Sequence, residues 1–435
     1  MVKKIDTAIV KLWGDTIGAV SWLDNRNYGI FEYNRGFLKK GLDVSPIMMS
    51  LNAARAGNGK FFFASLNKDT YLGLPGLLAD ALPDKFGNSI IDAWLARNGR
   101  DSSNFNPVER LCYTGRRAMG ALEFSPPVIE KYDKSVSVEI AELVKLAQEV
   151  MNERKGLNVQ LGDCKHENAD AILDILRVGT SAGGARPKAV IAMNEKGKVI
   201  SGQADVPKGY NYWLLKFDGV TDLELGKPGG YGRIEYAYYL MAKAAGINMS
   251  QSKLLEENGR AHFMTKRFDR IGREKQHMQS LCGIAHYDFN MAGAYSYEQA
   301  FELMRKLRLS KTEASQQYRR MIFNIVARNQ DDHTKNIAFL MGKDGQWKLS
   351  PAYDVTYSHN PAGKWTNQHQ MSINAKRDHF TKAELIHTGK SISLSKPEEI
   401  IDEVIVAVDK WIEFADKAGV DKKVSLEVKK QHRKL

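Results

Sequence analysis

The spacing of the apolar residues changes along the chain, and this change limits the possible folds more than any other feature. Residues 8–33 alternate between apolar and polar positions and contain turn residues, which predicts short antiparallel strands. After about residue 290 the spacing becomes helical. Ser296 and Ser310 are each followed three residues later by Gln or Glu, which predicts two capped helix starts. A strand-rich part followed by a helical part predicts an α+β protein with two lobes and a cleft between them.

The length of 435 residues predicts more than one domain within this plan. In the N-terminal part, a helical stretch at 77–96 contains Pro83, which starts or bends the helix. Further along, apolar runs predict strands at 189–193, 198–201, 212–217 and 262–268. We therefore expect a β-rich subdomain over residues 1–127, a mixed α/β region over 128–290 and an all-helical domain over 291–435.

The overall composition indicates a compartment and a class of partner. A net charge of +12 favours polyanions such as nucleic acid, ATP or an acidic protein, although solubility alone also explains a basic protein. Three cysteines without a CxxC pair argue against a disulfide framework and a structural zinc site. The start has no secretory pattern, and no apolar run reaches the ~18 residues of a membrane span. We expect a cytoplasmic protein without membrane contact, whose basic tail from Lys422 to Lys434 is solvated or frayed.

One polar segment carries the residue types that phosphoryl transfer requires. Asp331 precedes Asn336 by five residues, a predicted hairpin follows with its turn at 342–345, and Asp354 comes directly after it. Kinases use an Asp beside the attacking hydroxyl, an Asn five residues later and a second Asp, the last two as Mg²⁺ ligands. Asp332 is the alternative base, although its four-residue spacing to Asn336 fits this pattern less well. A plain surface loop could have the same composition, but not readily the whole ordered series.

A glycine-bearing segment and an isolated lysine form the second candidate feature. Gly183 and Gly184 lie in a loop over residues 181–188, and glycines allow backbone N–H groups to approach a phosphate closely. Taken alone, this loop fits a simple turn equally well. Lys216 follows in an apolar strand, where a buried cation needs an anionic partner such as the phosphates of ATP. An edge-strand lysine that reaches solvent is the alternative.

Taken together and in this order, these motifs resemble the HipA family of bacterial kinase toxins over nearly the whole chain. The similarity rests on the segments 74–84, 115–122, 181–188, 266–270, 331–336 and 350–354, together with Lys216. The resemblance implies a distantly protein-kinase-like fold. In that fold residues 1–127 are the HipA-type N-terminal subdomain, 128–290 the nucleotide-binding N-lobe-like region and 291–435 the catalytic C-lobe-like domain.

The resemblance also implies a role for each matching position. Asp331 would be the catalytic base, and Asn336 and Asp354 would bind Mg²⁺. Ser181 would be autophosphorylated, which expels the phosphate loop, although Thr180 beside it could carry the phosphate instead. The nucleotide would contact Lys216 and Gly183–Gly184 at its phosphates, Lys266 and Phe268 at the adenine hinge, and also His333 and Tyr353.

The family further implies partners and a biological role. The expected activity is that of an ATP- and Mg²⁺-dependent serine/threonine protein kinase, the toxin of a toxin–antitoxin pair. A HipB-like antitoxin, a DNA-binding dimer, would neutralise it and join it on operator DNA, and the substrate would be an aminoacyl-tRNA synthetase or another translation protein. Two alternatives stay open: a small-molecule phosphotransferase of the same fold, and a non-catalytic co-repressor subunit.

Overall fold

The computed structural model describes residues 4–128, 137–153, 187–203, 205–220 and 230–435, and these form two compact units. Unit 1 draws on Met1–Ser45, Met49–Gly229 and Lys253–Met278, and contains two antiparallel sheets. Unit 2 draws on Pro46–Met48, Gly230–Ser252 and Gln279–Leu435, and is mainly helical. The predicted α+β class with a strand-rich part and a helical part is confirmed. The boundaries between the three predicted domains stay predictions.

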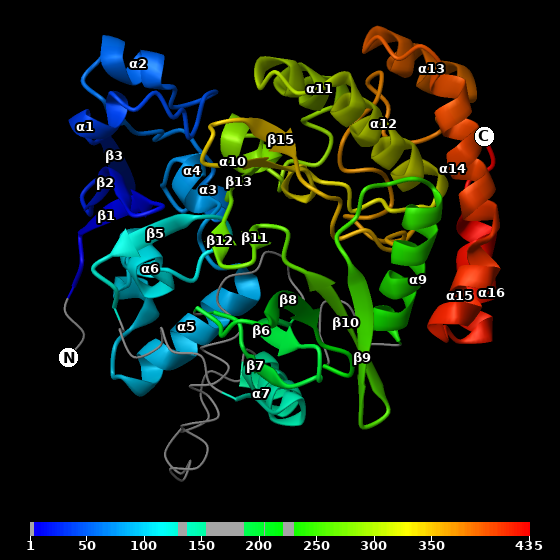
Figure 1. Ribbon diagram of the computed structural model, residues 1–435, viewed down its shortest axis with the longest axis horizontal. Helices are drawn as coiled ribbons and strands as arrows, with labels where there is room; N and C mark the ends of the chain where they lie inside the picture. Colours follow the sequence, from blue (N-terminus) through cyan, green and yellow to red (C-terminus); the bar gives the residue numbers. More distant parts are fainter. Residues whose placement is uncertain (1–3, 129–136, 154–186, 204, 221–229) are drawn as a thin grey trace. The chain divides into compact units, whose positions relative to one another are not determined.

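The first sheet of unit 1 is built from the alternating N-terminal segment, as predicted. Its strand order is β4-β3-β2-β1-β5, and all neighbouring pairs are antiparallel (Figure 1). The apolar side chains of every second residue are buried, including Val10, Val20 and Phe31. The strands are β1 (Thr7–Leu12), β2 (Asp15–Leu23), β3 (Tyr28–Tyr33), β4 (Lys60–Phe61) and β5 (Leu122–Ser125).

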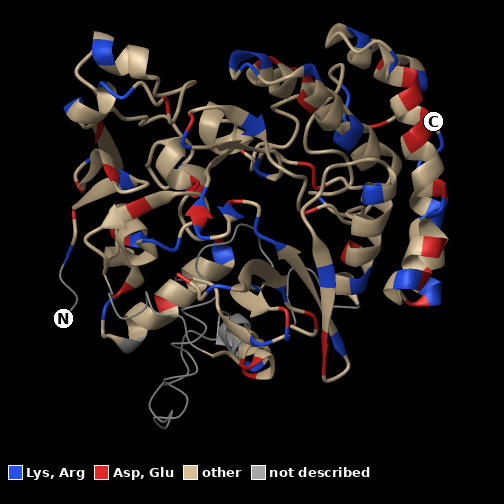
Figure 2. Cartoon of the chain, viewed as in Figure 1, with Lys and Arg blue, Asp and Glu red and all other residues tan. Residues whose placement is uncertain are grey.

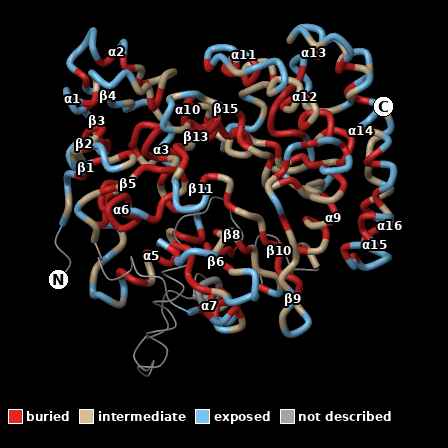
Figure 3. The backbone as a smooth tube through the Cα atoms, in the orientation of Figure 1, coloured by how far each residue is buried: buried red, intermediate tan, exposed pale blue. Residues whose placement is uncertain are grey.

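The second sheet of unit 1 has the order β7-β6-β8-β10-β9 and contains the strands predicted from the apolar runs. Strand β6 is buried nearly end to end (Figure 3), which explains its continuous rather than alternating apolar pattern. The strands are β6 (Lys188–Asn194), β7 (Val199–Ser201), β8 (Tyr210–Lys216), β9 (Ser252–Glu257) and β10 (Arg260–Lys266). The short pair β11 (Arg270–Ile271) and β12 (Glu274–Lys275) follows.

The helices of unit 1 include the stretch where Pro83 was expected to start or bend a helix. The stretch consists of two helices, α4 (Gly76–Ala79) and α5 (Lys85–Arg97). Asp84 directly after the proline caps α5, because its Oδ1 accepts a hydrogen bond from the Gly87 N–H at 2.7 Å. The remaining helices are α1 (Arg35–Leu38), α2 (Leu51–Ala56), α3 (Lys68–Tyr71), η1 (Ser102–Asn104), α6 (Pro107–Thr114) and α7 (Ile140–Glu153).

Two helices of unit 2 begin where the sequence predicts capped helix starts. Ser296 and Ser310 form complete capping boxes at the starts of α11 and α12. Tyr238 and Trp411 are fully buried in the core that these helices share, and α12 packs against α14. The helices are α9 (Tyr231–Ala244), α10 (Leu281–Ala285), α11 (Tyr297–Lys306), α12 (Lys311–Val326), η3 (Thr334–Asn336), α13 (Lys382–Ser391), α14 (Pro397–Asp409), α15 (Trp411–Ala418) and α16 (Lys422–Gln431).

The basic C-terminal segment is not frayed, and that part of the expectation is wrong. Its lysines from Lys422 to Lys430 lie on α16 (Figure 2), and residues after the helix are held by unit 2. The Arg433 N–H donates to the Val326 carbonyl at 2.9 Å, and Arg328 Nε donates to the Gln431 carbonyl at 2.9 Å. The tail is therefore fixed to the end of α12, because its backbone finds partners there.

No helix among the described residues has the length and apolarity needed to cross a membrane.

Candidate active site

The predicted catalytic segment lies between α12 and a hairpin of unit 2. After α12, the loop with Asp331 leads into η3, then β14 (Ala338–Met341) and β15 (Trp347–Leu349). The two strands are antiparallel, and the Gly345 N–H donates to the Gly342 carbonyl at 3.0 Å, so the predicted hairpin and its turn are confirmed. These strands lie in the region expected to be all-helical. With β13 (His277–Ser280) they form a three-stranded sheet, after which the chain reaches Asp354.

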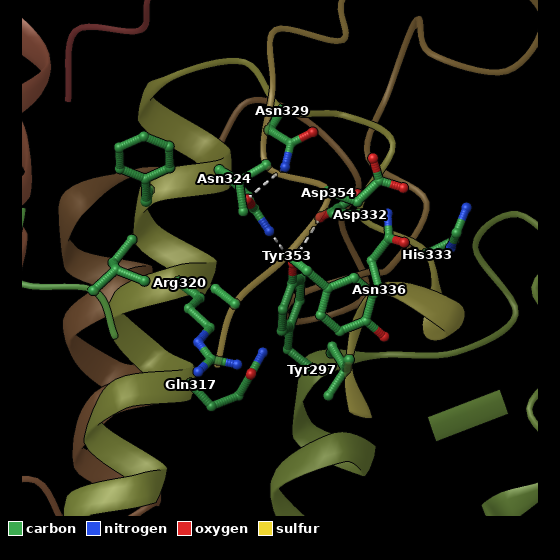
Figure 4. A pocket seen from close by; sticks show the side chains of 15 residues that line it. Tyr297, Gln317, Arg320, Asn324, Asn329, Asp332, His333, Asn336, Tyr353 and Asp354 are labelled. Carbon is green, nitrogen blue, oxygen red and sulfur yellow. Dashed lines mark hydrogen bonds between the residues drawn. The ribbon is translucent and has the colours of Figure 1, made fainter. Parts of the chain in front are cut away.

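This loop borders a pocket of unit 2 that encloses about 420 Å³, including space open to solvent. Four of the predicted site residues line the pocket: His333, Asn336, Tyr353 and Asp354 (Figure 4). Asp332 also lines it, whereas Asp331 does not. The loop residues and the residues after the hairpin, 17 or more positions apart in sequence, therefore share one cavity.

The two adjacent aspartates have different environments. The Asp331 side chain is 38% exposed, and its Oδ1 accepts a hydrogen bond from Trp365 Nε1 at 2.6 Å. Its pKa is raised, mainly because partial burial disfavours the charged form, and the nearby Asp354 adds to this effect. His333, with its Nε2 3.8 Å from the same oxygen, and the Trp365 hydrogen bond limit the rise. Asp331 is thus an accessible carboxylate with a raised proton affinity.

Asp332 is instead buried, and donors surround its carboxylate. Its Oδ2 accepts hydrogen bonds from the Tyr297 hydroxyl at 2.8 Å and from His369 Nδ1 at 2.9 Å, and its Oδ1 accepts one from the Gln370 N–H at 2.8 Å. Burial alone raises the pKa of Asp332, but His369 and the other donors more than offset this, so the pKa is lowered. An aspartate held in this way joins three segments of unit 2 and has little capacity to accept a proton.

Asn336 is oriented by the loop itself. Its Nδ2 donates to the Asp331 carbonyl at 2.8 Å, which fixes the amide plane. Because the nitrogen is engaged in this way, Oδ1 is the atom of Asn336 that can serve as a ligand for a hard cation.

Asp354 has an unusual backbone conformation. Its φ is +55°, in the left-handed region that non-glycine residues rarely adopt, although Asp and Asn tolerate it better than others. Neighbouring contacts hold this segment: the Tyr353 hydroxyl donates to the Lys335 carbonyl, and the Ala352 N–H donates to the Asn248 carbonyl at 2.8 Å. Strained backbone of this kind is concentrated at functional sites, where surrounding structure maintains it.

The remaining described candidates belong to unit 1. Lys216 ends β8, and its partner on β6 is Lys188, which itself lies 3.6 Å from Asp84 in a buried ion pair. The Lys216 Nζ also lies 5.8 Å from the centre of the Phe263 ring. Two further candidates, Lys266 at the end of β10 and Phe268 just beyond it, are half-buried. Three other candidates, Ser181, Gly183 and Gly184, and the alternative Thr180 lie outside the described residues.

Sequence reasoning missed the side chains that hold the two aspartates. Trp365 reaches Asp331 from 34 positions away, and Tyr297 and His369 reach Asp332 from 35 and 37 positions away. No spacing rule links residues so distant in sequence. Trp365 has one local signal, because a tryptophan within the polar segment 358–370 is out of place on composition alone.

The donor atoms of unit 2 fit a magnesium ion better than a transition metal. Among the described residues, no three His, Cys, Asp or Glu side chains gather to form a metal site of their own. Asn336 and Asp354 line the same pocket. The atoms with which they could bind a metal ion are oxygens, Oδ1 of Asn336 and the carboxylate oxygens of Asp354. Mg²⁺ in nucleotide enzymes takes one or two protein oxygens and completes its shell with phosphate oxygens and water, which matches this donor set.

Comparisons with known proteins identify relatives in sequence and fold. The family model for the HipA-like C-terminal domain matches residues 180–412, and that for the HipA N-terminal domain matches residues 8–125. Curated protein sequences give no match. A chain in the structure of the Shewanella oneidensis MR-1 toxin–antitoxin complex of HipA, HipB and operator DNA is 16% identical. It matches 98% of this chain and 95% of its own with a TM-score of 0.67, which shows a similar fold.

A second solved structure, the Helicobacter pylori proinflammatory kinase CtkA, is 11% identical. It matches 57% of this chain and 95% of its own with a TM-score of 0.34, too low to support a statement about this chain. The two family models cover most of the sequence, and the C-terminal model alone covers more than half of it. The chain therefore belongs to the HipA family.

Proposed function

We propose that the chain is an ATP- and Mg²⁺-dependent serine/threonine protein kinase that acts as the toxin of a toxin–antitoxin pair. The main support is the contrast between the two adjacent aspartates. Asp332 has its oxygens occupied by Tyr297, His369 and Gln370, whereas Asp331 is accessible and has a raised pKa. A general base needs both accessibility and proton affinity, and Asp331 has the five-residue spacing to Asn336 that kinases use.

In this proposal the unit 2 site supplies the base and the ligands of the metal ion, and His333 and Tyr353 would also contact the nucleotide. Asp331 accepts the proton of the substrate hydroxyl, while Trp365 and His333 hold and orient its carboxylate. Asn336 Oδ1 and the Asp354 carboxylate would hold Mg²⁺. When bound, Mg²⁺-ATP supplies the γ-phosphoryl group and the positive charge that balances it.

The nucleotide-binding part of the proposal concerns unit 1. Lys216 would contact the phosphates, and Lys266 with Phe268 would border the adenine, as the family implies. The loop with Gly183 and Gly184 would cover the phosphates, and phosphorylation of Ser181 in that loop would switch the kinase off. A phosphate adds about −1.5 to −2 charges, which repels the phosphates of ATP.

The proposed partners follow the family. The similar Shewanella chain was solved in a complex with HipB and operator DNA. A HipB-like DNA-binding antitoxin and, through it, operator DNA are the corresponding proposal here, and a net charge of +12 suits DNA. An aminoacyl-tRNA synthetase or another translation protein is the proposed substrate, and the cytoplasm the proposed compartment.

Transfer of label from γ-³²P-ATP tests the proposal. The purified chain with Mg²⁺ should label itself on serine and label one or a few proteins of a bacterial lysate, which mass spectrometry then identifies. Label found only in small metabolites would favour a small-molecule phosphotransferase. Nucleotide binding without any turnover, in the presence of a functional antitoxin complex, would favour a co-repressor.

The pH dependence of the reaction should reveal the environment of Asp331. Because the base must be ionised and its pKa is raised, kcat/KM should fall with decreasing pH at a midpoint above the ordinary Asp value of about 3.9. Trp365→Phe removes the hydrogen bond that lowers this pKa, so the midpoint should move to still higher pH.

Trp347→Phe is the matched control for Trp365→Phe, because Trp347 lies on β15 and makes no hydrogen bond to Asp331. Its pH profile should coincide with that of the wild type. A midpoint in Trp365→Phe that stays in place or moves to lower pH would contradict the proposed role of the hydrogen bond.

A further inference from the structure

Three polar residues form a buried stripe on α12, the helix behind the catalytic loop. Gln317, Arg320 and Asn324 follow one another at helical spacing and all line the pocket that Asp354 also lines (Figure 4). Gln317 is 1% exposed and Arg320 is 7% exposed. Their helix is otherwise packed in the core through Met321, Ile322, Phe323, Ile325 and Val326. Burying polar groups costs free energy unless they find hydrogen-bond partners, so the partners of these three residues determine whether their burial is favourable.

One end of the stripe is satisfied by the network around Asp332. The Asn324 Nδ2 donates to the Tyr297 hydroxyl at 3.1 Å, and Asn324 Oδ1 accepts from Asn329 Nδ2 at 2.9 Å. Tyr297 in turn donates to Asp332. Asn324 therefore connects α12 with the part of the loop that is already fully hydrogen-bonded.

The other end of the stripe is not satisfied in this way. Arg320 donates from Nη2 to the Ser350 carbonyl at 2.6 Å, but its Nε has no hydrogen-bond partner, and neither has Gln317 Oε1. No Asp or Glu of the described part of the chain forms an ion pair with Arg320. Burial lowers the pKa of this arginine to about 10, so it still carries its charge at neutral pH. A buried N–H and a buried carbonyl oxygen on one cavity are the partners that an ordered water joins.

The charges on the pocket exclude a free anion, one without a metal ion, as the reason for Arg320. Arg320 is the one Arg or Lys among the lining residues, whereas Asp332 and Asp354 contribute two carboxylates. An anion would meet more negative than positive charge there. The hydrogen bond from Arg320 to the chain itself remains as the reason for its burial.

The hydrogen bond of Arg320 also acts on the segment that carries Asp354. Its acceptor, Ser350, stands four residues before Asp354, and the Ser350 N–H donates to the Ala338 carbonyl at 2.9 Å. Arg320 thereby fixes the start of the segment from Ser350 to Asp354, at whose end the backbone is left-handed. A displacement at the start would move the carboxylate at the end.

We propose that Arg320 is a positioning residue for Asp354, which it holds ready for the metal through Ser350 and through an ordered water shared with Gln317. This inference rests on the proposed function, because it assigns Asp354 to Mg²⁺. Arg320 does not touch substrate or metal and acts through other residues. Side chains in such positions typically change metal affinity about 10–100-fold when they are removed.

Arg320→Met tests this role, because methionine keeps much of the side-chain volume and removes the charge and the donors. The Mg²⁺ concentration for half-maximal phosphoryl transfer should rise about 10–100-fold, with kcat at saturating Mg²⁺ much less affected. Mn²⁺ binding in the presence of a non-hydrolysable ATP analogue, followed by electron paramagnetic resonance, should weaken by a similar factor without any turnover. Arg320→Lys restores a charge and a donor and should recover part of the affinity.

Arg319→Met is the matched control on the same helix. Arg319 pairs with Glu403 at 2.6 Å and donates to the Ala245 carbonyl, so its loss should leave Mn²⁺ affinity unchanged. Gln317→Met removes the acceptor of the proposed water together with the amide NH₂ group, and should weaken Mn²⁺ binding by a smaller factor than Arg320→Met. It keeps the test valid if Arg320→Met does not fold.

Two outcomes separate this inference from the proposed function. A folded Arg320→Met or Gln317→Met protein with wild-type Mn²⁺ affinity, alongside an active wild type, would overturn the role of Arg320 and leave the kinase proposal standing. A wild-type protein that neither transfers phosphate nor binds Mn²⁺ with nucleotide would remove the proposed function and the inference with it.

Discussion

Asp331→Asn is expected to lower the rate of phosphoryl transfer by about 10²–10⁴-fold while the protein stays folded. Asparagine keeps the Oδ1 that accepts the Trp365 hydrogen bond at 2.6 Å, so the loop should hold its shape. Its amide cannot accept the proton of the attacking hydroxyl. Single-turnover rates with saturating Mg²⁺-ATP measure the loss, and the melting temperature reports the fold.

Asp332→Asn is the matched substitution at the neighbouring residue. It should lower the stability of the fold rather than remove the base. One of its two oxygens would become a donor facing Tyr297, His369 or Gln370, which costs about 1–3 kcal/mol of folding free energy for a buried donor left without an acceptor. The melting temperature should fall. A folded Asp332→Asn protein that loses its activity, beside an Asp331→Asn protein that keeps it, would show that Asp332 is the base.

Asp269→Asn should destabilise unit 1 by about 3–5 kcal/mol, since it removes one partner of a buried charge cluster. The Asp269 carboxylate is fully buried and lies 2.6 Å from Nη2 of Arg267 and 2.6 Å from Nη1 of Arg270. Its Oδ2 also accepts the Gly120 N–H at 2.7 Å. Without the negative charge, two buried guanidinium groups face each other uncompensated. The midpoint of urea unfolding measures the effect.

The same cluster predicts how stability depends on pH. Burial alone raises the pKa of Asp269, but Arg267 and Arg270 more than offset this and hold it well below its usual range. A group with a depressed pKa stabilises the fold above its unfolded value near 3.9, and this contribution is lost as the pH falls towards the folded pKa. The difference between wild type and Asp269→Asn should therefore shrink below about pH 4.

Asp205→Asn provides the control for charge removal in unit 1. Asp205 is 69% exposed at its side chain and lies 3.4 Å from Arg116, so the loss should cost less than about 1 kcal/mol. If Asp205→Asn and Asp269→Asn lowered the free energy of unfolding equally, the result would contradict the proposed role of the Asp269 charge cluster.

The parts of the fold that could be predicted depend on local patterns. The capping boxes at Ser296 and Ser310, the hairpin turn at 342–345 and the alternation in β1–β3 each arise from residues within a few positions of one another. The break at Pro83 belongs to the same class. Such signals determine where elements begin and end, so these predictions are confirmed.

The interactions that distinguish the site residues could not be predicted in this way. Trp365 and His369 reach the loop that carries Asp331 and Asp332 from more than 30 positions away, and neither spacing nor propensity encodes such contacts. The burial of Arg320 could not be predicted for another reason. An arginine in a helix is expected at the surface, and only the packing around α12 shows that this one is buried. The prediction of a frayed C-terminal tail is wrong for the reason that applies to Trp365 and His369. The Val326 carbonyl, which accepts a hydrogen bond from the Arg433 N–H, is more than 100 positions away in the sequence.

Asp331 and Asp332 are distinguished both by their spacing in the sequence and by their hydrogen bonds in the structure. Spacing to Asn336 favours Asp331 in the sequence but leaves Asp332 open. Hydrogen bonding in unit 2 gives an independent physical reason for the same preference, since Asp332 is occupied and Asp331 is accessible. The roles of both residues in a reaction stay predictions.

Anomalous diffraction from crystals grown with Mn²⁺ and a non-hydrolysable ATP analogue tests the central claim most directly. The account predicts a manganese peak between Asn336 Oδ1 and the Asp354 carboxylate, at about 2.1 Å from each oxygen. A bound nucleotide whose metal ion lies away from Asn336 and Asp354 would contradict it.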